Sequence, residues 1–398
     1  MKEVKLMKRI FQFILVFCLL LIGAYAKPVV SPQHSKQKVI KNHKKESSKN
    51  KQVAFKPSKV GALKAASFSK FINKSAESFT KEYGEPLEIQ DNYLGSQWWI
   101  FGEDEHDYLQ VEVKDNKIRS IFVLGDKVDV TPLKIGMTLK DVAALTTIYS
   151  DFTSTYKDKS YTFELTEQDM NYRPLLAFDN DSFAMLHFSQ STGKLLGIRY
   201  LNSELLLRLM PYQLIEPESY SLSWPVKEET KEISEAGNRQ LEMLIRIMRK
   251  RDKLPAYSFS PIKRAEAERL ILAFEKEPQI YFESMESFNE WQDLTPENSE
   301  VSYRTLYKLN KESYQQLVKE PEENSHGFLL KPSQDIPYIL MSIYGNISSQ
   351  KHFLMKEDNE IGLAVTKNHI LILLTNKKNQ EDSLSTESTE VITSEVDK

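Results

Sequence analysis

The sequence predicts an α+β protein in which a duplicated helix-plus-antiparallel-sheet domain precedes an α/β/α sandwich. Three observations predict this class. Short apolar runs separated by polar turns fill residues 97–201, apolar residues recur at helical spacing beyond the middle of the chain, and prolines cluster between these regions. A chain of 398 residues has room for two domains and two tails. We therefore assign residues 61–210 to the first domain, 211–236 to a linker and 237–375 to the second domain.

In the first domain, a helix followed by antiparallel strands is predicted twice in succession. In the first copy a helix over residues 75–83 stops at Gly84, and strands follow between 97 and 124. In the second copy Thr138 is placed to cap a helix, and strand-like runs follow between 160 and 201. The repeated order predicts an internal duplication of a helix-plus-sheet unit.

The second domain combines amphipathic helices with a buried hairpin. Ser260 is a helix N-cap with Pro261 in the first helical position, and Gly345 occupies the place of a left-handed helix terminator. Two short apolar runs within residues 361–374 predict the hairpin. Helices that flank a small sheet predict an α/β/α sandwich. The predicted helices centre on residues 241–251, 261–274, 303–317 and 336–345.

The N-terminus carries the pattern of an export signal. A charged start precedes the uncharged apolar run 10–26, which ends in the small-x-small sequence Ala24-Tyr25-Ala26, so we expect cleavage after Ala26. An uncleaved run of this length could remain as a membrane anchor. Cys18 is the only cysteine, so a cleaved chain has none, which excludes thiol catalysis and a thiolate metal site.

Charge is distributed unevenly along the chain. Residues 27–59 hold ten lysines against the single Glu46, whereas the net charge of the whole chain is −3, so the remainder is acidic. We expect residues 27–60 to form a basic disordered arm that meets anionic lipid or envelope polymer, with a plain solvated tether as the alternative. Residues 376–398 are rich in Ser, Thr and Glu and predict an acidic disordered tail.

Several stretches of the second domain match, in order, the signatures of a known family. They are an arginine (Arg246 or Arg249) before Leu254-Pro255, the pair Tyr281-Phe282, Glu323-Asn324, and residues 344–355 followed by 361–365. Asn346 and Gly362 are retained from the last signature. Residues 238–374 therefore resemble the CAP superfamily, named for cysteine-rich secretory proteins, antigen 5 and pathogenesis-related proteins.

The first domain carries a second set of matches. Tyr83-Gly84-Glu85-Pro86, the pair Trp98-Trp99, Tyr108 and Ile135-Gly136-Met137-Thr138 resemble the CAP-associated domain of Gram-positive envelope proteins. Trp98 and Trp99 point to opposite faces if they lie on a strand, so one is expected in the core and the other exposed or at a domain contact. We take Trp98, Trp99 and Tyr108 as a candidate surface for a glycan or protein partner.

The resemblance also implies a groove in which family members hold a divalent metal with a histidine pair and acidic partners. This sequence has no histidine between His187 and His326. We therefore expect no bound metal, no cofactor and no catalytic residue. The family's signature positions are filled by Glu268 or Leu272, Ser284, Met341, and Ser349-Gln350-Lys351, and a shift of two residues would bring in His352.

Four residues remain as candidates for that groove: Glu268, Glu323, His326 and Gln350. His326, close to Glu323, is the strongest metal-ligand candidate, but one histidine with one glutamate falls short of the three or four ligands of an ordinary site. A crowded acidic turn at 103–107 suggests calcium, although its spacing lacks the alternation of a calcium loop and favours a solvated turn.

These observations predict an exported cell-envelope protein of the CAP type that acts by binding or interaction and lacks an intact metal or catalytic site. Its partners would be an anionic envelope polymer or lipid and an unidentified protein or glycan, but no nucleic acid. The chain has no glycine-rich phosphate loop, no His-Glu-x-x-His and no Gly-x-Ser-x-Gly motif. The alternative is a diverged hydrolase that acts on peptide or cell-wall polymer with Glu268, Glu323 and His326 in one groove.

Overall fold

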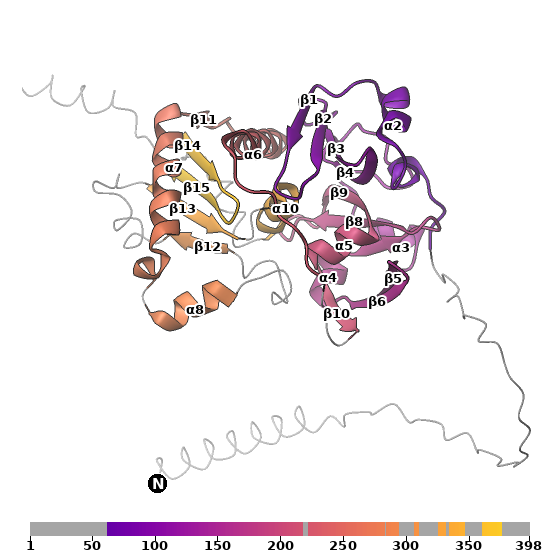
Figure 1. Cartoon of the computed structure of the whole chain (residues 1–398). Helices are drawn as coiled ribbons and strands as arrows, with labels where there is room; N and C mark the ends of the chain where they lie inside the picture. Colours follow the sequence, from indigo (N-terminus) through magenta and orange to yellow (C-terminus); the bar gives the residue numbers. More distant parts are fainter. Residues whose placement is uncertain are drawn as a thin grey trace, which may run out of the picture. The chain divides into compact units, whose positions relative to one another are not determined.

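The computed structural model describes residues 62–217, 222–282, 284–293, 306–309, 325–331, 334–346 and 360–375, with only the backbone given for 306–309 and 325–326. All of these residues belong to one compact unit, residues 58–398 (Figure 1). The expected signal peptide with its cleavage site after Ala26, the basic arm and the acidic tail lie outside the described residues. Among the described residues, no helix is both long and apolar enough to cross a membrane.

A seven-stranded antiparallel sheet with the order β1-β2-β3-β4-β9-β8-β7 forms the centre of the first domain. The two predicted meanders share this one sheet because β4 pairs with β9. The predicted run 160–165 belongs instead to a separate three-stranded sheet, β10-β6-β5. The strands are β1 (Glu88–Asp91), β2 (Gln97–Phe101), β3 (Leu109–Lys114), β4 (Lys117–Val123), β5 (Asp151–Tyr156), β6 (Lys159–Glu164), β7 (Leu175–Ala177), β8 (Ser182–Phe188), β9 (Leu195–Asn202) and β10 (Gln213–Glu216).

The helix boundaries in this domain follow local signals. The predicted stop of α2 (Ala76–Tyr83) at Gly84 is confirmed, and Gly84 has a φ of +82°, which glycine adopts without strain. The predicted cap of α3 (Leu139–Leu145) is also confirmed, since Thr138 and Asp141 form a reciprocal capping box. The other helices are η1 (Ser67–Phe71), α4 (Glu167–Tyr172) and α5 (Ser203–Leu209).

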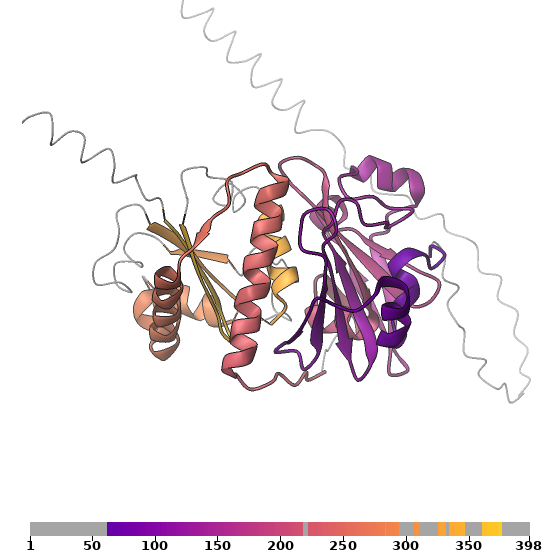
Figure 2. The same ribbon diagram turned by 90° about the horizontal axis from the view of Figure 1, so that it is seen from above.

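The second domain is a sandwich of helices around a five-stranded sheet with the order β11-β14-β15-β13-β12. Helix α7 (Pro261–Lys276) covers one face, while α6 (Lys231–Arg251) and α10 (Ile336–Gly345) cover the other. Figure 2 shows α6 between the two sheets, and α6 contacts β14 on one side and β1 on the other. The predicted α+β class is confirmed. The remaining elements are β11 (Ser258–Phe259), η2 (Pro278–Tyr281), α8 (Met285–Asp293), β12 (Leu306–Leu309), β13 (Ser325–Leu330), β14 (Glu360–Val365) and β15 (Ile370–Thr375).

Three local expectations differ from the structure. The helix expected over 303–317 is wrong where the chain is described, because β12 pairs with β13 and this pairing overrides local periodicity. Helix α6 begins at Lys231, inside the expected linker, where Thr230 caps it. Gly345 ends α10 as expected, but its φ is not positive. Its lack of a side chain serves close approach instead, since a Cβ there would lie 3.2 Å from the carbonyl oxygen of Phe188.

A second glycine is required by packing between α7 and β14. A Cβ on Gly362 would overlap the carbonyl oxygen of Lys263 and lie 2.8 Å from its carbonyl carbon. We expect Gly362→Ala to lower the free energy of unfolding by about 1–3 kcal/mol, because the backbone of α7 would have to move away from the sheet. Urea denaturation measures the change. Gly345→Ala is the matched comparison and should cost less, and equal stability of Gly362→Ala and the wild type would contradict the expectation.

Candidate functional site

The predicted groove residues are only partly described. Glu268 lies on the exposed side of α7, where its Oε1 accepts from Arg264 Nε at 3.0 Å. The opposite side of α7, with Ala267 and Leu270, packs on the sheet. Glu268 therefore points away from the sheet, in a surface ion pair that is worth little to stability.

The other three groove candidates cannot be placed by their side chains. Glu323 and Gln350 lie outside the described residues. His326 pairs with Leu374 in the ladder of β13 and β15, but its side chain is not described. The groove thus stays a prediction. Among the residues that the structure describes, no group of three or more His, Cys, Asp or Glu side chains is arranged to hold a metal ion.

The acidic turn at 103–107 has a structural use. The Oδ1 atom of Asp107 accepts from the backbone N–H groups of Glu103 and Asp104, at 3.0 and 3.1 Å, and Asp104 Oδ1 accepts from that of His106 at 2.8 Å. The bond from the backbone N–H of His106 holds the pKa of Asp104 below its usual value. Glu105 forms an ion pair with Lys250 of α6 at 2.6 Å. The carboxylates therefore shape the turn and link it to the second domain.

The candidate interaction surface needs a correction for two of its three residues. Trp98 and Tyr108 are 1% and 0% exposed, so neither ring is available to an external partner. Both belong to a hydrophobic core that also contains residues of α6, α10, β14 and β15. Trp99 points to the other face of the sheet and is half-buried against the second core of the first domain. The two motif residues Trp98 and Tyr108 thus lie in a core that the first domain shares with the second.

The junction between the two domains includes several buried polar groups. Side chains alternate along a strand, so Tyr108, which directly precedes β3, shares the face toward the second domain with Gln110 and Glu112 of β3. His187 of β8 and Arg199 of β9 lie on the same face. Each of the five is at most 4% exposed. Gln110 Oε1 accepts from Tyr108 Oη at 2.8 Å and from Gln240 Nε2 of α6 at 3.2 Å. Buried polar groups need partners, and Gln110 finds one of its partners across the junction, in Gln240.

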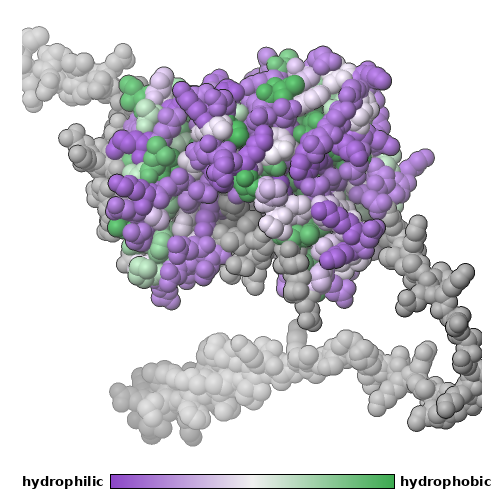
Figure 3. All heavy atoms as spheres, in the orientation of Figure 1, coloured by the Kyte–Doolittle hydropathy of each residue, from purple (hydrophilic) through white to green (hydrophobic). Residues whose placement is uncertain are grey.

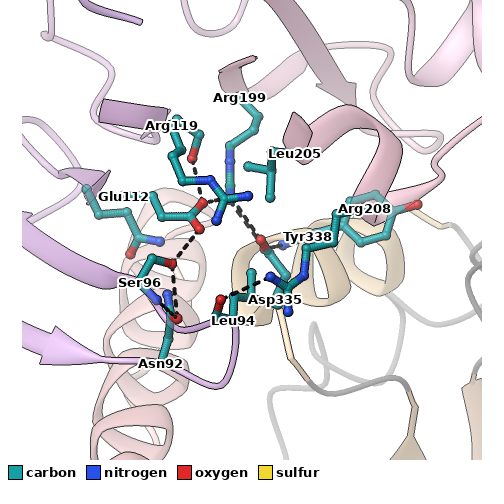
Figure 4. A network of polar contacts seen from close by, with 12 residues as sticks. Asn92, Leu94, Ser96, Glu112, Arg119, Arg199, Leu205, Arg208, Asp335 and Tyr338 are labelled. Carbon is teal, nitrogen blue, oxygen red and sulfur yellow. Dashed lines mark hydrogen bonds and ion pairs between the residues drawn. The ribbon is translucent and has the colours of Figure 1, made fainter. Parts of the chain in front are cut away.

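Arg199 is the central residue of this network (Figure 4). Its guanidinium donates to both carboxylate oxygens of Asp335, at 2.8 and 3.3 Å, and to Glu112 Oε2 at 3.2 Å. Asp335 is the N-cap of α10 and accepts from the backbone N–H of Tyr338 at 3.0 Å. One arginine of the first domain therefore fixes the start of a helix in the second.

Further bonds support the two carboxylates. Glu112 also accepts from the hydroxyls of Ser96 and Ser120, at 2.6 and 3.1 Å. Burial raises the pKa of Asp335, whereas the charge of Arg199 opposes that rise. A buried carboxylate is costly unless it is paired and hydrogen-bonded, and both conditions hold here.

A second arginine ties α10 to the first domain. Arg173, which follows α4, donates to Tyr338 Oη at 3.1 Å, to Asp169 Oδ1 at 2.7 Å and to the carbonyl oxygen of Pro211. At the other end of α10, the backbone N–H of Gln190 donates to the carbonyl oxygen of Gly345 at 2.9 Å. The helix is therefore held by the first domain at both ends.

A smaller polar and aromatic cluster secures the hairpin of β14 and β15 to α7. Glu275 Oε1 accepts from Thr366 Oγ1 at 2.6 Å and lies 2.7 Å from Nδ1 of His369. The His369 ring stacks on Trp291 of α8, with centroids 5.6 Å apart, and meets Phe274 edge-on. These contacts hold the tip of the hairpin against α7 and α8, so the cluster has a structural role.

The outer surface in the view of Figure 3 is mainly hydrophilic, and apolar side chains occur there in small separate groups. The described residues with the most exposed large apolar side chains include Leu87, Ile262, Leu272 and Met285. Scattered exposed apolar residues are normal for a folded protein. The most elaborate arrangement of functional groups in the described chain is therefore the internal junction.

The fold defines a class of protein in which an antiparallel-sheet domain is joined through a buried interface to a domain with helices on both faces of a five-stranded sheet. Residues 72–212 match the sequence model of the CAP-associated N-terminal family. Residues 72–212 thus match the CAP-associated N-terminal family in sequence, and the chain has the fold of SCP-domain and cysteine-rich secretory proteins, as the resemblance in the sequence implied.

Two solved structures share this fold. One is an extracellular protein containing a SCP domain from Bacillus anthracis str. Ames, with a TM-score of 0.60 and 22% identity over 85% of this chain and 100% of that one. The other is a cysteine-rich secretory protein from Staphylococcus aureus subsp. aureus Mu50, with a TM-score of 0.63 and 19% identity over 80% of this chain and 97% of that one. At these identities the likeness establishes the fold.

A curated relative is the uncharacterized membrane protein YlbC of Bacillus subtilis (strain 168). The two sequences are 29% identical over 185 residues, which is 45% of this chain. The match spans 52% of the relative, so the chain covers about half the length of that protein.

Proposed function

We propose that this chain is an exported cell-envelope protein whose CAP-like domain binds a partner while its CAP-associated domain holds it in place. The observation that carries the proposal is the likeness in fold, over the full length of the matched chain, to a protein described as extracellular. The apolar run 10–26 supplies a matching export signal. The match to a membrane protein supports envelope association as well.

Binding is preferred to catalysis because of what occupies the family's histidine positions. Leu272 and Ser284 are exposed, Met341 is buried, and none of these side chains can act as an imidazole base or metal ligand. Glu268, the carboxylate that the hydrolase alternative needs beside Glu323 and His326, is paired with Arg264 on the outer side of α7. That position gives the alternative no support.

The proposed external partner of the arm is an anionic envelope polymer or lipid. The ten lysines of residues 27–59 supply the charge for such binding. Attraction of this kind weakens as salt rises, because exposed charges are screened over about 8 Å at physiological ionic strength. The arm would localise the chain, and the CAP-like domain would carry the specific interaction.

Export is tested with the full chain carrying a C-terminal epitope tag. In intact bacterial cells, added protease is expected to destroy the tag of the wild type and spare that of Leu20→Arg/Leu21→Arg, because two charges disrupt the apolar run. Leu20→Ala/Leu21→Ala is the matched control and should behave as the wild type. N-terminal sequencing of the exported product shows whether cleavage follows Ala26. A wild-type tag that stays protected until the cells are lysed would contradict export.

The proposal that the chain binds rather than catalyses would be contradicted by an enzymatic activity. Hydrolysis of a peptide or wall polymer by the purified chain, lost on Glu323→Ala or His326→Ala, would establish the enzyme alternative instead. Loss of hydrolysis in these variants must occur without loss of folding, which far-ultraviolet circular dichroism checks.

A further inference from the structure

His187 is a buried titratable residue inside the junction. Phe183, Met185 and His187 are every second residue of β8, so their side chains point to the same face of the sheet. Phe183 and Met185 belong to the core shared with α10, and the His187 ring lies on that face as well. It is 4% exposed, and its ring meets Phe122 edge-on with centroids 6.3 Å apart. Helix α10 packs on β8 and β9. The imidazole is therefore enclosed by the contact between the two domains.

Among the described residues, the two charged groups that lower the pKa of His187 are both positive. They belong to Arg173 and Arg199, the two arginines that bond α10 through Tyr338 and Asp335. The neighbouring carboxylates are already engaged, since Asp169 pairs with Arg173 while Glu112 and Asp335 share Arg199. A protonated His187 would add a third positive charge to this buried site, where the neighbouring carboxylates of the described residues already pair with arginines.

We propose that the contact between α10 and the sheet of the CAP-associated domain is an acid-sensitive junction that opens when His187 is protonated. Opening exposes the ring to water and removes the repulsion from Arg173 and Arg199. It also frees the start of α10, which those arginines hold. The two domains then move as separate bodies. The junction would respond to acid whether or not the chain is exported.

The junction is expected to open at low pH because the closed state favours the neutral form of the His187 ring. Burial, then the charges of Arg173 and Arg199, lower the pKa of His187 from 6.5 to about 3. A neutral base whose pKa is lowered in the closed state contributes its full stabilising free energy to that state above pH 6.5. This stabilising free energy is lost as the pH falls from 6.5 toward 3. If the opened ring regains its ordinary pKa, lowering the pH from 7 to 5 shifts the closed-to-open equilibrium toward opening by about twenty-five-fold.

Amide hydrogen exchange of the full chain tests this at pH 7 and pH 5, with correction for intrinsic exchange rates. Protection in α10 is expected to fall by about twenty-five-fold in the wild type, while β3 and β4 keep theirs. His187→Gln and His187→Phe should remove the difference between the two pH values. His106→Gln is the matched control, because His106 is 39% exposed outside this network, and it should behave as the wild type.

Three results would overturn the proposal. They are constant protection of α10 in the wild type, an equal loss in the His187 variants, and a loss in β3 and β4 that keeps pace with α10, which signifies global unfolding. A second measurement needs no variant. Nuclear magnetic resonance of the wild-type histidine rings should find His187 neutral in the closed chain at pH 6, and a midpoint near 6.5 for that ring would overturn the proposal as well.

Discussion

Arg199→Met is expected to lower the free energy of unfolding by about 3–5 kcal/mol, because it leaves two buried carboxylates without their cation. The side chains of Arg199, Glu112 and Asp335 are 2%, 0% and 3% exposed, so water cannot replace the lost bonds without entering the junction. Urea denaturation followed by circular dichroism measures the change. Methionine keeps much of the side-chain length, so the charge rather than the volume is tested.

Two comparisons sharpen the result for Arg199. Arg264→Met removes an exposed ion pair with Glu268, for which a change of only about 0–1 kcal/mol is expected. The combined variant Arg199→Met/Glu112→Gln/Asp335→Asn should recover much of the lost stability, because it also removes the stranded charges, and Asn can still cap α10. An Arg199 variant as stable as the Arg264 variant would show that the network is dispensable.

Trp98→Ala is expected to lower the free energy of unfolding by about 3–5 kcal/mol, because it opens a cavity in the core shared by the two domains. Trp98 is 1% exposed, and the guanidinium of Arg199 lies 4.6 Å from its ring centroid. The substitution therefore removes both apolar contact and a cation–π interaction inside the junction. Thermal unfolding of the full chain, monitored by circular dichroism, measures the change.

The neighbouring tryptophan provides the matched control. Trp99 is half-buried on the opposite face of the same strand, so Trp99→Ala should cost distinctly less and leave the junction closed. Equal losses for the two substitutions would contradict the assignment of Trp98 to the shared core. The Trp98 and Arg199 variants should not be additive when combined, because the two side chains touch.

These substitutions bear on the role of the CAP-associated domain. Its motif residues Trp98 and Tyr108 lie in the core with α6 and α10, and its Arg199 and Arg173 bond α10 directly. Helix α10 leads into residues 346–365, where the CAP signature would stand. In this chain the first domain therefore holds α10 of the second domain in place.

Sequence patterns predicted the elements of the second domain well where local signals are strong. The helix ending at Gly345 and the hairpin of β14 and β15 were expected, as was the N-cap Ser260. The expected helix over 303–317 failed at β12, where pairing with β13 decides the conformation. Periodicity reports how a segment could fold by itself, and a neighbouring strand can reverse that preference.

The candidate site was harder to predict. Glu268 was a candidate because of its position in the sequence, but only the packing of α7 shows that it faces outward. The network around Arg199 was not expected at all. Its one signal in the sequence is the strand that contains Gln110 and Glu112, whose alternation is typical of a strand with one face in water. Both side chains are 0% exposed, because that face meets a second domain.

The sequence by itself determined the α+β class, the order of the two domains, most helix ends and the resemblance to CAP proteins, because these depend on neighbouring residues and short motifs. Only the tertiary structure decided that the two meanders form one sheet, that Trp98 and Tyr108 face inward, and that Arg199 caps α10 through Asp335. The last contact joins residues 136 positions apart. Local patterning specifies which side of an element is polar, but whether that side meets water or another domain depends on distant residues that only folding brings together.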